Sequence, residues 1–314
     1  MKAVIKSRSI LIILIILVFS VSGLLLAFHK EEATTPIESI RNSSGLQLMV
    51  ADQNTQPTLR IVLPSHATSD RSIEILFPEH LTIKPQGNTD ARQIYMFRPG
   101  KVGDPPQWER SEKSLAYEKT IPGKMYMRAT AILVDDGVRF QFKLRNLSKE
   151  NYDLALAILD PRLTSEFHDE RLERTFVHHA DGFDLLASET PNRLTMPMNE
   201  WLPARYLVSF TWPIPSKLVD HRDDGITYYN KSRKVDAPFI ATFSKDKSWV
   251  IASFTYNTGN VWSNPDLTCQ HVDPQASLSP GEEVILETKM LIVRSSLDEV
   301  FRKAMQQRDS LIHK

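Results

Sequence analysis

The strongest constraint on the fold is a stretch in the middle of the chain where apolar and polar residues alternate. The alternation runs without a break from Val138 to Arg145. It predicts a strand with one buried face, because successive side chains of a strand point to opposite faces. Just before it, Asp135-Asp136-Gly137 offers the residues of a tight hairpin turn after a strand at Met125–Val134. A further apolar run, Leu154–Leu159, follows the Asn146–Asn151 loop. We therefore expect a three-stranded antiparallel meander here.

Other segments repeat this pattern of short strands and polar turns. A second hairpin is expected between Phe239–Phe243 and Trp249–Tyr256, joined by the Ser244–Ser248 loop. A long final strand, Glu283–Val293, is expected after the Pro280-Gly281 turn. Shorter strands are expected earlier in the chain, at Leu59–Leu63, Ile73–Phe77 and Gln93–Phe97. The pattern predicts an all-β fold, an antiparallel β-sandwich.

Beyond the N-terminal segment, only the C-terminal end has a helical pattern. Ser296 and Glu299 have the spacing of a capping box. The apolar residues that share one helical face after this point are Leu297, Val300, Phe301, Ala304 and Met305. We expect a short amphipathic helix within residues 296–314, which closes the sandwich.

The N-terminus carries an apolar segment of a different kind. Residues 10–28 hold no charge, a run of about 19 residues that can cross a bilayer as a helix at roughly 1.5 Å per residue. Lys2, Lys6 and Arg8 precede it, so the positive-inside rule places the N-terminus in the cytoplasm and the remainder outside. We expect residues 1–29 to be a membrane anchor or a cleaved signal segment, and we favour the anchor.

Composition limits the partners of the remaining chain. Residues 30–45 are polar and predict a tether, followed by the β-sandwich over residues 46–295. The chain has 38 Lys+Arg and 38 Asp+Glu, and without the three N-terminal positive charges the balance is 35 against 38, or −3. This charge distribution argues against a nucleic-acid partner. The single cysteine, Cys269, excludes an internal disulfide, and no cofactor is expected.

The sharpest polar cluster is Cys269-Gln270-His271-Val272-Asp273. On a strand, the side chains of Cys269, His271 and Asp273 would point to one face. A thiol, an imidazole and a carboxylate together can bind a metal ion or position a proton transfer. The spacing is not a metal signature by itself, and we expect no metal. A structural cluster is the alternative, since Asp273 precedes Pro274, where it can order a turn.

Histidines gather in a second segment. Phe167-His168-Asp169-Glu170 is followed by Arg174-Thr175-Phe176-Val177-His178-His179. Imidazoles exchange protons near neutral pH and bind metals, but His178 and His179 would face opposite sides of a strand. A polar loop with one satisfied histidine is the alternative. A third cluster, His221-Arg222-Asp223-Asp224-Gly225, fits a solvated turn.

Aromatic residues form a fourth group of candidates, because flat aromatic faces stack on the apolar C–H faces of sugar rings. Trp262 lies in a loop-like segment just before Cys269–Asp273. Core packing is the alternative for each tryptophan, above all for Trp249. The group consists of Trp201, Trp212, Trp249, Trp262, Tyr228 and Tyr229. The motifs of serine hydrolases, P-loop NTPases, zincins and thioredoxins are missing from the sequence, which disfavours those classes.

The second half, residues 138–300, resembles a group of uncharacterised secreted or anchored bacterial β-sandwich proteins. Three stretches carry the resemblance: Asn146-Leu147-Ser148, Phe167–Val177, and Cys269–Pro274 followed by Pro280-Gly281-Glu282. The pattern is similar in outline to the galactose-mutarotase-like supersandwich. This resemblance implies a carbohydrate context and no particular reaction. Mutarotases of that fold use a His acid and a Glu base, and we match no Glu of this chain to that base.

These features predict a membrane-anchored β-sandwich, periplasmic or on the cell surface, that recognises a cell-envelope glycan or a polysaccharide. It is secreted if the leader is cleaved. The partners are then the lipid bilayer, through residues 10–28, and a carbohydrate. Trp262 would stack on a sugar ring, Arg174 would pair with a carboxylate or sulfate, and His271 with Asp273 would bind hydroxyls. The residues expected to line one groove are His168, Arg174, Trp262, His271 and Asp273.

Two alternatives stay open. The first is an epimerase, lyase or hydrolase in which His271 or His168 is the acid/base and Asp273 orients it. The second is a structural or assembly role in the cell envelope, with these clusters as ordinary loop chemistry.

Overall fold

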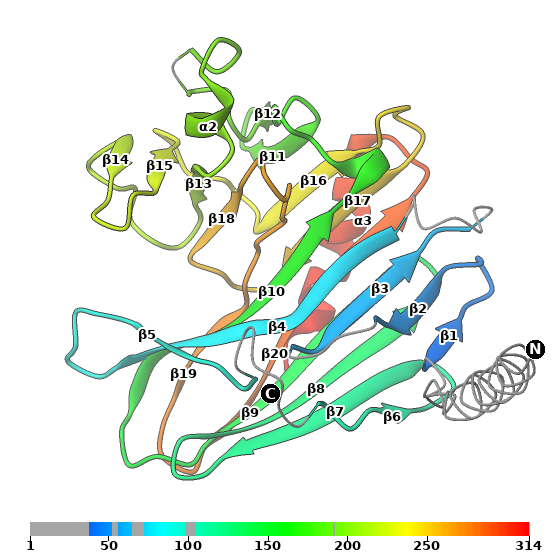
Figure 1. Ribbon diagram of the computed structural model, residues 1–314, viewed down its shortest axis with the longest axis vertical. Helices are drawn as coiled ribbons and strands as arrows, with labels where there is room; N and C mark the ends of the chain where they lie inside the picture. The colour runs from blue at the N-terminus through cyan, green and yellow to red at the C-terminus, as the bar shows by residue number, and fades with distance from the viewer. Residues whose placement is uncertain (1–37, 52–55, 65–71, 98–104, 191, 314) are drawn as a thin grey trace, which may run out of the picture. The chain divides into compact units, whose positions relative to one another are not determined.

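A computed structural model describes residues 38–51, 56–64, 72–97, 105–190 and 192–313. The strands of this part form three sheets (Figure 1). The expected membrane segment, residues 10–28, lies outside the described residues. Among the helices that are described, none has the length and apolar character needed to cross a bilayer.

The first sheet has seven strands in the order β1-β2-β3-β4-β10-β19, with β5 paired to β4. Its strands are β1 (Ser39–Arg41), β2 (Gln47–Val50), β3 (Thr58–Val62), β4 (Ser72–Pro85), β5 (Arg92–Ile94), β10 (Tyr152–Leu163) and β19 (Gln275–Leu278). Strand β1 falls inside the segment expected to be a tether, so the ordered sheet begins earlier than the expected boundary at residue 46.

The second sheet has nine strands in the order β12-β11-β16-β17-β20-β9-β8-β7-β6. Its strands are β6 (Glu109–Arg110), β7 (Ser114–Ile121), β8 (Met125–Val134), β9 (Gly137–Asn146), β11 (Thr175–His179), β12 (Gly182–Leu185), β16 (Phe239–Phe243), β17 (Val250–Thr255) and β20 (Glu283–Val293).

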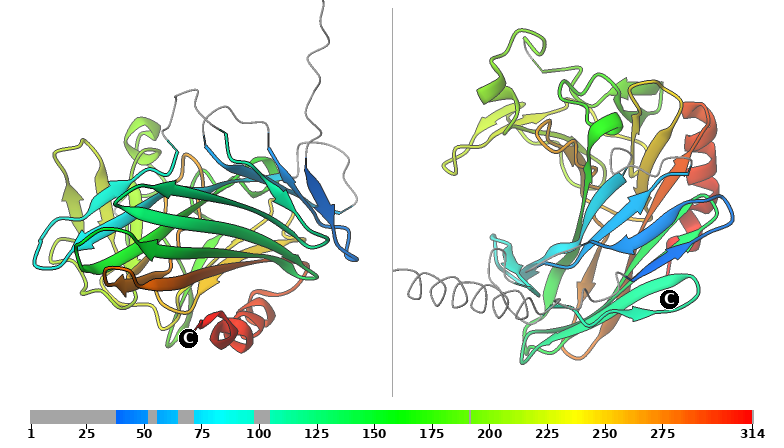
Figure 2. Two further views of the ribbon diagram at one scale, coloured as in Figure 1. Left: turned by 90° about the horizontal axis from the view of Figure 1, so that it is seen from below. Right: turned by 45° about the vertical axis from the view of Figure 1, so that its right-hand side comes forward.

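The main core lies between these two sheets, which stack on each other (Figure 2). Strand β8 shows the cause, because every second side chain from Met125 to Leu133 is buried in this core. Phe77 of β4 meets Phe140 and Phe142 of β9 there, with ring centroids 5.5 and 5.0 Å apart. The alternation seen in the sequence is therefore the pattern of one sheet face packed on another.

Helix α3 (Leu297–Arg308) covers the outer face of the nine-stranded sheet (Figure 1). The Ser296 side chain accepts a hydrogen bond from the backbone N–H of Glu299, as the capping box predicts. All six residues of β17 are buried, because one face of this strand meets the other sheet and the opposite face meets α3. The expected C-terminal helix is thus confirmed.

A smaller sheet of four strands, in the order β14-β15-β13-β18, stands beside the sandwich with the short helix α2 (Met198–Trp201). Its strands are β13 (Arg205–Ser209), β14 (Val219–His221), β15 (Thr227–Asn230) and β18 (Asn260–Ser263). Trp201, Tyr206 and Val261 belong to its separate apolar cluster. Two short 3-10 helices, η2 (Ser165–Phe167) and η3 (Asp309–Leu311), complete the described elements.

The predicted hairpins agree with the structure in most places. Strands β8 and β9 form an antiparallel hairpin around Asp135 and Asp136, and β16 pairs with β17 as expected. The final strand has the expected bounds. The predicted fold class, a mostly-β antiparallel sandwich with a short C-terminal helix, is confirmed for the described residues.

The prediction that Leu154–Leu159 forms the third strand of the meander was wrong. β9 pairs with β8 on one side and with β20 on the other, so it has no free edge for β10. β10 crosses instead to the seven-stranded sheet, between β4 and β19. The buried Asn146 organises this crossing, because its side-chain amide donates to the carbonyls of Glu150 and Leu278.

Candidate functional site

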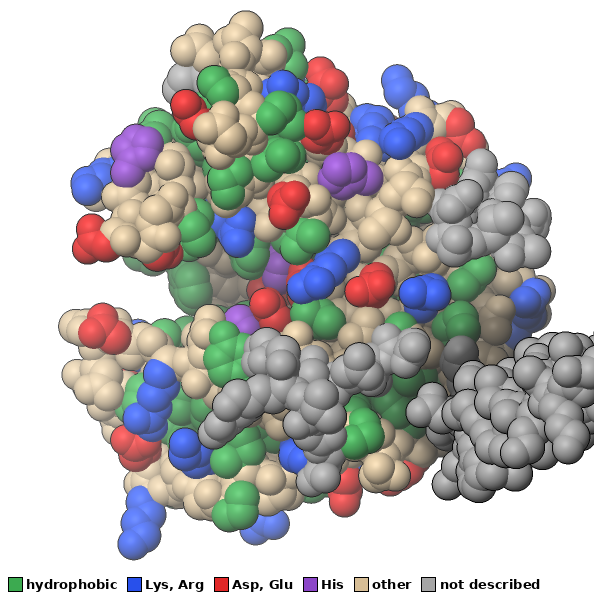
Figure 3. Space-filling view, viewed as in Figure 1, with side chains coloured by type: hydrophobic (Ala, Val, Ile, Leu, Met, Phe, Trp, Pro, Cys, Tyr) green, Lys and Arg blue, Asp and Glu red, His purple; other side chains and the backbone are tan. Residues whose placement is uncertain are grey.

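A pocket of about 260 Å³ opens where the small sheet faces β10. Figure 3 shows this side of the molecule hollowed between the lobe that carries β14 and β15 and the part below it. The pocket is lined by side chains from β10, β13, β15 and β18, and from the segments beside them. Its volume is slightly below the range of roughly 300 to 1,000 Å³ usual for ligand pockets, which suits one small ring.

Aromatic faces form much of the pocket wall. Trp262 of β18, Tyr228 of β15 and Trp212 all line it. Trp212 is 37% exposed, whereas Trp201 is fully buried. Its indole lies against Gly259, where a Cβ atom would come within 2.0 Å of Trp212 Cε2. A glycine is therefore required at position 259 for Trp212 to lie in this place.

Two guanidinium groups stack on these aromatic residues. The Arg222 guanidinium lies 3.6 Å from the ring centroid of Tyr228, and that of Arg205 lies 5.5 Å from Trp262. Both arginines line the pocket, together with Asn260 and Asp273. The pocket thus combines flat apolar faces with charged and amide hydrogen-bonding groups.

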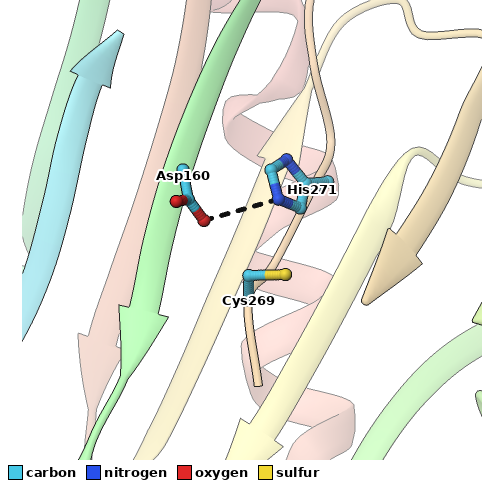
Figure 4. A group of neighbouring side chains, drawn as sticks. All are labelled: Asp160, Cys269 and His271. Atoms are coloured by element: carbon cyan, nitrogen blue, oxygen red, sulfur yellow. Dashed lines mark ion pairs between the residues drawn. The ribbon is translucent and has the colours of Figure 1, made fainter. Parts of the chain in front are cut away.

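Behind Trp262 lies a buried group of ionisable side chains. The rings of Trp262 and His271 stack with centroids 3.7 Å apart and planes 1° apart. His271 Nε2 lies 3.5 Å from Asp160 Oδ1, and His271 Nδ1 lies 3.4 Å from Asp273 Oδ2. Figure 4 shows Asp160 on β10 facing the imidazole of His271. Asp273 connects this buried group to the pocket, because it lines the pocket wall.

The segment Cys269–Asp273 is not the strand that we expected. Only His271 pairs with a neighbour, through an isolated antiparallel bridge to Trp262. The two backbones exchange hydrogen bonds of 3.0 and 3.1 Å. The predicted proximity of His271 and Asp273 holds nonetheless, and the bridge to Trp262 fixes the imidazole against the indole.

Burial and neighbouring charges shift the ionisation of this group. Burial opposes a charged His271, but Cys269, Asp273 and Asp160 hold its pKa well above the usual value. Burial raises the pKa of Asp273 despite the opposing effect of His271. Burial would also raise the pKa of Asp160, yet His271 and Arg162 lower it. The pKa shifts therefore favour the charged forms of His271 and Asp160 and the protonated form of Asp273.

Strand β4 adds two ionisable residues to the same region. Burial and the neighbouring Asp160 raise the pKa of Glu79. Burial and the charge on His271 lower the pKa of His80 to about 4. His80 is the register partner of Ile158, which lines the pocket. The ionisable group therefore extends from the Cys269–Asp273 segment across β10 to β4.

Asp160, Cys269 and His271 also have the donor atoms that zinc takes in proteins. Their oxygen, sulfur and nitrogen atoms all lie within 4.8 Å of one another. Each group already has a partner in the protein, because Asp160 Oδ2 accepts from Arg162 Nε at 2.7 Å and Cys269 Sγ lies 3.4 Å from Asn264 Oδ1. We therefore treat the three as part of the ion-paired group.

The expected single groove of five residues is not what the structure shows. Trp262 and Asp273 line the pocket, and His271 lies directly behind them. His168 lines a different pocket, beside Arg162 and Asp266. Arg174 donates to the backbone carbonyls of Phe243, Glu166 and His168, so its guanidinium is occupied within the protein. The backbone N–H groups of Phe243 and Lys245, at the end of β16, donate to the carbonyls of Arg174 and Glu166, so the Arg174 side chain lies against this end of β16.

Sequence analysis missed several residues of the site. Asp160 had a usable signal, since it is the one charged residue inside the apolar part of β10. Arg205 had none, because β13 pairs in parallel with β15 across a long connection. Arg222 belongs to the third cluster, which the sequence suggested to be a solvated turn. His178, from the second cluster, stacks on Phe301 of α3 with ring centroids 3.8 Å apart, away from the pocket. Trp201 and Trp249 are buried, as the core-packing alternative predicts.

No protein-family model matches the sequence, and no curated protein matches it. Among solved structures, the chain is similar to a galactose mutarotase related enzyme from Lactobacillus acidophilus. The identity is 11%, over 83% of this chain and 98% of that chain, with a TM-score of 0.45. A galactose mutarotase-like protein from Lactobacillus casei has 10% identity over 82% and 100%, with a TM-score of 0.43.

The chain is also similar to an alpha-N-acetylgalactosaminidase from Bifidobacterium bifidum in complex with GalNAc. The identity is 10%, over 87% of this chain and 39% of that chain, with a TM-score of 0.47. These likenesses agree with the galactose-mutarotase-like outline expected from the sequence.

Proposed function

We propose that this protein binds carbohydrate, with one sugar ring held in the pocket between β10 and the small sheet. The observation that carries the proposal is the juxtaposition of Trp212, Trp262 and Tyr228 with Arg205 and Asp273 in one concave site. A pyranose ring has apolar C–H faces and a rim of hydroxyl groups. An aromatic face can cover the former, while carboxylate and guanidinium groups hydrogen-bond the latter.

The rigidity of the wall supports this proposal. Trp262 is fixed by its stacking on His271 and by the backbone bridge, and Trp212 is fixed against Gly259. The backbone N–H groups of Phe210 and Trp212 both donate to the Gly259 carbonyl. A site formed in advance loses little conformational entropy when a ligand binds, so even a small ring can be held specifically.

Binding by the full-length chain to a panel of monosaccharides tests the proposal by calorimetry. We expect at least one sugar to bind saturably, and Trp212→Ala and Trp262→Ala each to weaken it about tenfold or more, about 1.4 kcal/mol. Tyr256→Ala is the matched control, because Tyr256 is an exposed aromatic residue outside the pocket lining. A wild-type chain that binds no sugar, or tryptophan variants that bind as well as the control, would favour the structural or assembly role instead.

A second candidate function is acid–base catalysis on the bound sugar, as in an epimerase, lyase or hydrolase. The specific observation is that Asp273 lines the pocket while His271 and Asp160 lie behind it. A buried carboxyl that holds a proton can donate it to a sugar oxygen, and the adjacent imidazole can stabilise the resulting carboxylate.

Product formation from the sugars that bind distinguishes catalysis from binding alone. We expect Asp273→Asn to lower the turnover rate about 100-fold or more, since an amide cannot donate or accept the proton. Asp223→Asn serves as the control, because Asp223 is exposed in the turn after β14. Equal turnover by the Asp273 variant would remove Asp273 from the chemistry, and a lack of product from every sugar would leave binding as the function.

We further propose that the pocket works outside the cytoplasm, anchored through residues 10–28. The support is the uncharged run itself and the positive charges before it. Protease treatment of intact and of lysed cells tests this location: the described part of the chain should be cleaved without lysis once any outer barrier is opened, and protection until lysis would contradict it.

A further inference from the structure

We propose that the sugar held in this pocket carries an anionic group, a carboxylate or a sulfate ester. This inference rests on the proposed function and adds the class of ligand. It starts from the charges on the pocket wall, which comprise two guanidinium groups, Arg205 and Arg222, and one carboxylate, Asp273. The wall of the pocket therefore has an excess of positive charge.

Of the two arginines, Arg205 gives the stronger support for an anionic ligand. Within the described part of the chain, no carboxylate lies at ion-pair distance from its guanidinium, and Nη1 donates a hydrogen bond to the carbonyl of Pro203 at 2.8 Å. Stacking near Trp262 holds the planar group at the pocket wall. One of its five N–H donors is used in the bond to Pro203, and the other four have no hydrogen-bond acceptor among the described residues.

Arg222 approaches the pocket from the turn after β14. Its guanidinium stacks on Tyr228, and Nε lies 3.4 Å from Asp220 Oδ2. Its side chain is 50% exposed, so the pair with Asp220 is weak and leaves the outer N–H groups free. Arg205 stacks on Trp262 and Arg222 stacks on Tyr228, so a planar anion in the pocket can accept hydrogen bonds from two sides.

Asp273 does not cancel this positive charge. Its Oδ1 accepts from the backbone N–H of Leu159 at 3.2 Å, and its Oδ2 faces His271. The Asp273 carboxyl lines the pocket, but the positive charge that His271 carries on its inner side offsets its negative charge. A ligand carboxylate beside Arg205 would gain charge-assisted hydrogen bonds with a bidentate geometry, which a neutral hydroxymethyl group cannot form.

The sequence suggested Arg174 as the residue that binds the anionic group. The structure favours Arg205 instead. The Arg174 guanidinium donates hydrogen bonds to the carbonyls of Glu166 and Phe243, whereas that of Arg205 donates one, to the carbonyl of Pro203. The side-chain chemistry expected from the sequence is retained, but it comes from β13 instead of the loop before β11.

Calorimetric titrations with matched sugars test the inference. The probes are glucuronate, its neutral amide glucuronamide, glucose and glucose 6-sulfate, at two salt concentrations. We expect glucuronate or glucose 6-sulfate to bind at least tenfold more tightly than glucose and glucuronamide. The two anionic probes show which group is preferred, and added salt should reduce the preference.

The variant Arg205→Gln should reduce the ratio of anionic to neutral affinity to about twofold or less. Arg294→Gln is the matched control, because Arg294 also stacks on a tryptophan, Trp249, at 4.7 Å, yet does not line this pocket. Arg222→Gln should reduce the ratio by a smaller factor.

The experiments distinguish a failure of sugar binding from a failure of the preference for anionic sugars. If neutral and anionic sugars bind equally well, the anionic preference is overturned while sugar binding stands. An anionic preference that survives Arg205→Gln overturns the assignment to this residue. If no probe or panel sugar binds, both the inference and the proposed function fall.

Discussion

Replacement of Gly137 by alanine is expected to destabilise the fold by about 4 kcal/mol or more, near the upper limit for single substitutions. Gly137 begins β9 with φ +151°, and a Cβ atom there would lie 1.9 Å from the carbonyl oxygen of Met290. That oxygen belongs to the backbone of β20, which pairs with β9 from Glu283 to Leu291. Neither strand can move without disturbing the main core, so we expect a midpoint of thermal unfolding lower by about 10 °C or more.

Gly182→Ala is the matched control for this substitution. Gly182 also has a positive φ, +120°, but no atom lies within 4 Å of the position that its Cβ would occupy. This variant therefore measures the cost of the backbone conformation alone, roughly 1 to 3 kcal/mol. If the Gly137 variant melts at the same temperature as the Gly182 variant, the close contact between β9 and β20 is not as described.

Replacement of Gly259 by alanine is expected to abolish most of the sugar affinity while the protein stays folded. The new Cβ would lie 2.0 Å from Trp212 Cε2 and 2.2 Å from Cδ2. Because Trp212 is partly exposed, its indole can turn away into solvent without opening the core. The pocket then loses one aromatic wall, and we expect affinity to fall about tenfold or more with little change in thermal stability.

A double-mutant cycle separates this effect from general damage. Once Trp212 is alanine, Gly259→Ala has no indole to displace, so Gly259→Ala/Trp212→Ala should bind as Trp212→Ala does alone. Additive losses in the double variant would contradict the contact on which the prediction depends.

Most of the strands could be predicted from local patterns, because a strand on one sheet face imposes its two-residue period on the sequence. Strand β8 shows this period without exception, and the hairpin β16–β17 follows from its polar loop. The partner of β10 could not be predicted in this way. Its apolar run signals burial on both faces, and β4, with which it pairs, lies far away in the sequence.

The residues of the site likewise differ in whether local sequence pattern could predict them. His271 and Asp273 lie two residues apart, so the sequence alone suggests their proximity, and the structure confirms it. The aromatic and arginine walls come from the small sheet, where β13 pairs in parallel with β15 and antiparallel with β18. The alternation of apolar and polar residues within one strand does not show with which distant strand it pairs. The sequence therefore indicated Arg174 as the anion-binding residue, whereas we propose Arg205 for this role.

NMR of the tryptophan side chains shows whether a sugar ring lies between Trp212 and Trp262. The chain has five tryptophans, and each gives one indole N–H signal in a ¹⁵N-labelled sample. On titration with the best-bound sugar, we expect the signals of Trp212 and Trp262 to move in a saturable way. The buried Trp201 and Trp249 should stay in place. If the sugar binds while the signals of both Trp212 and Trp262 stay in place, the sugar does not lie in this pocket.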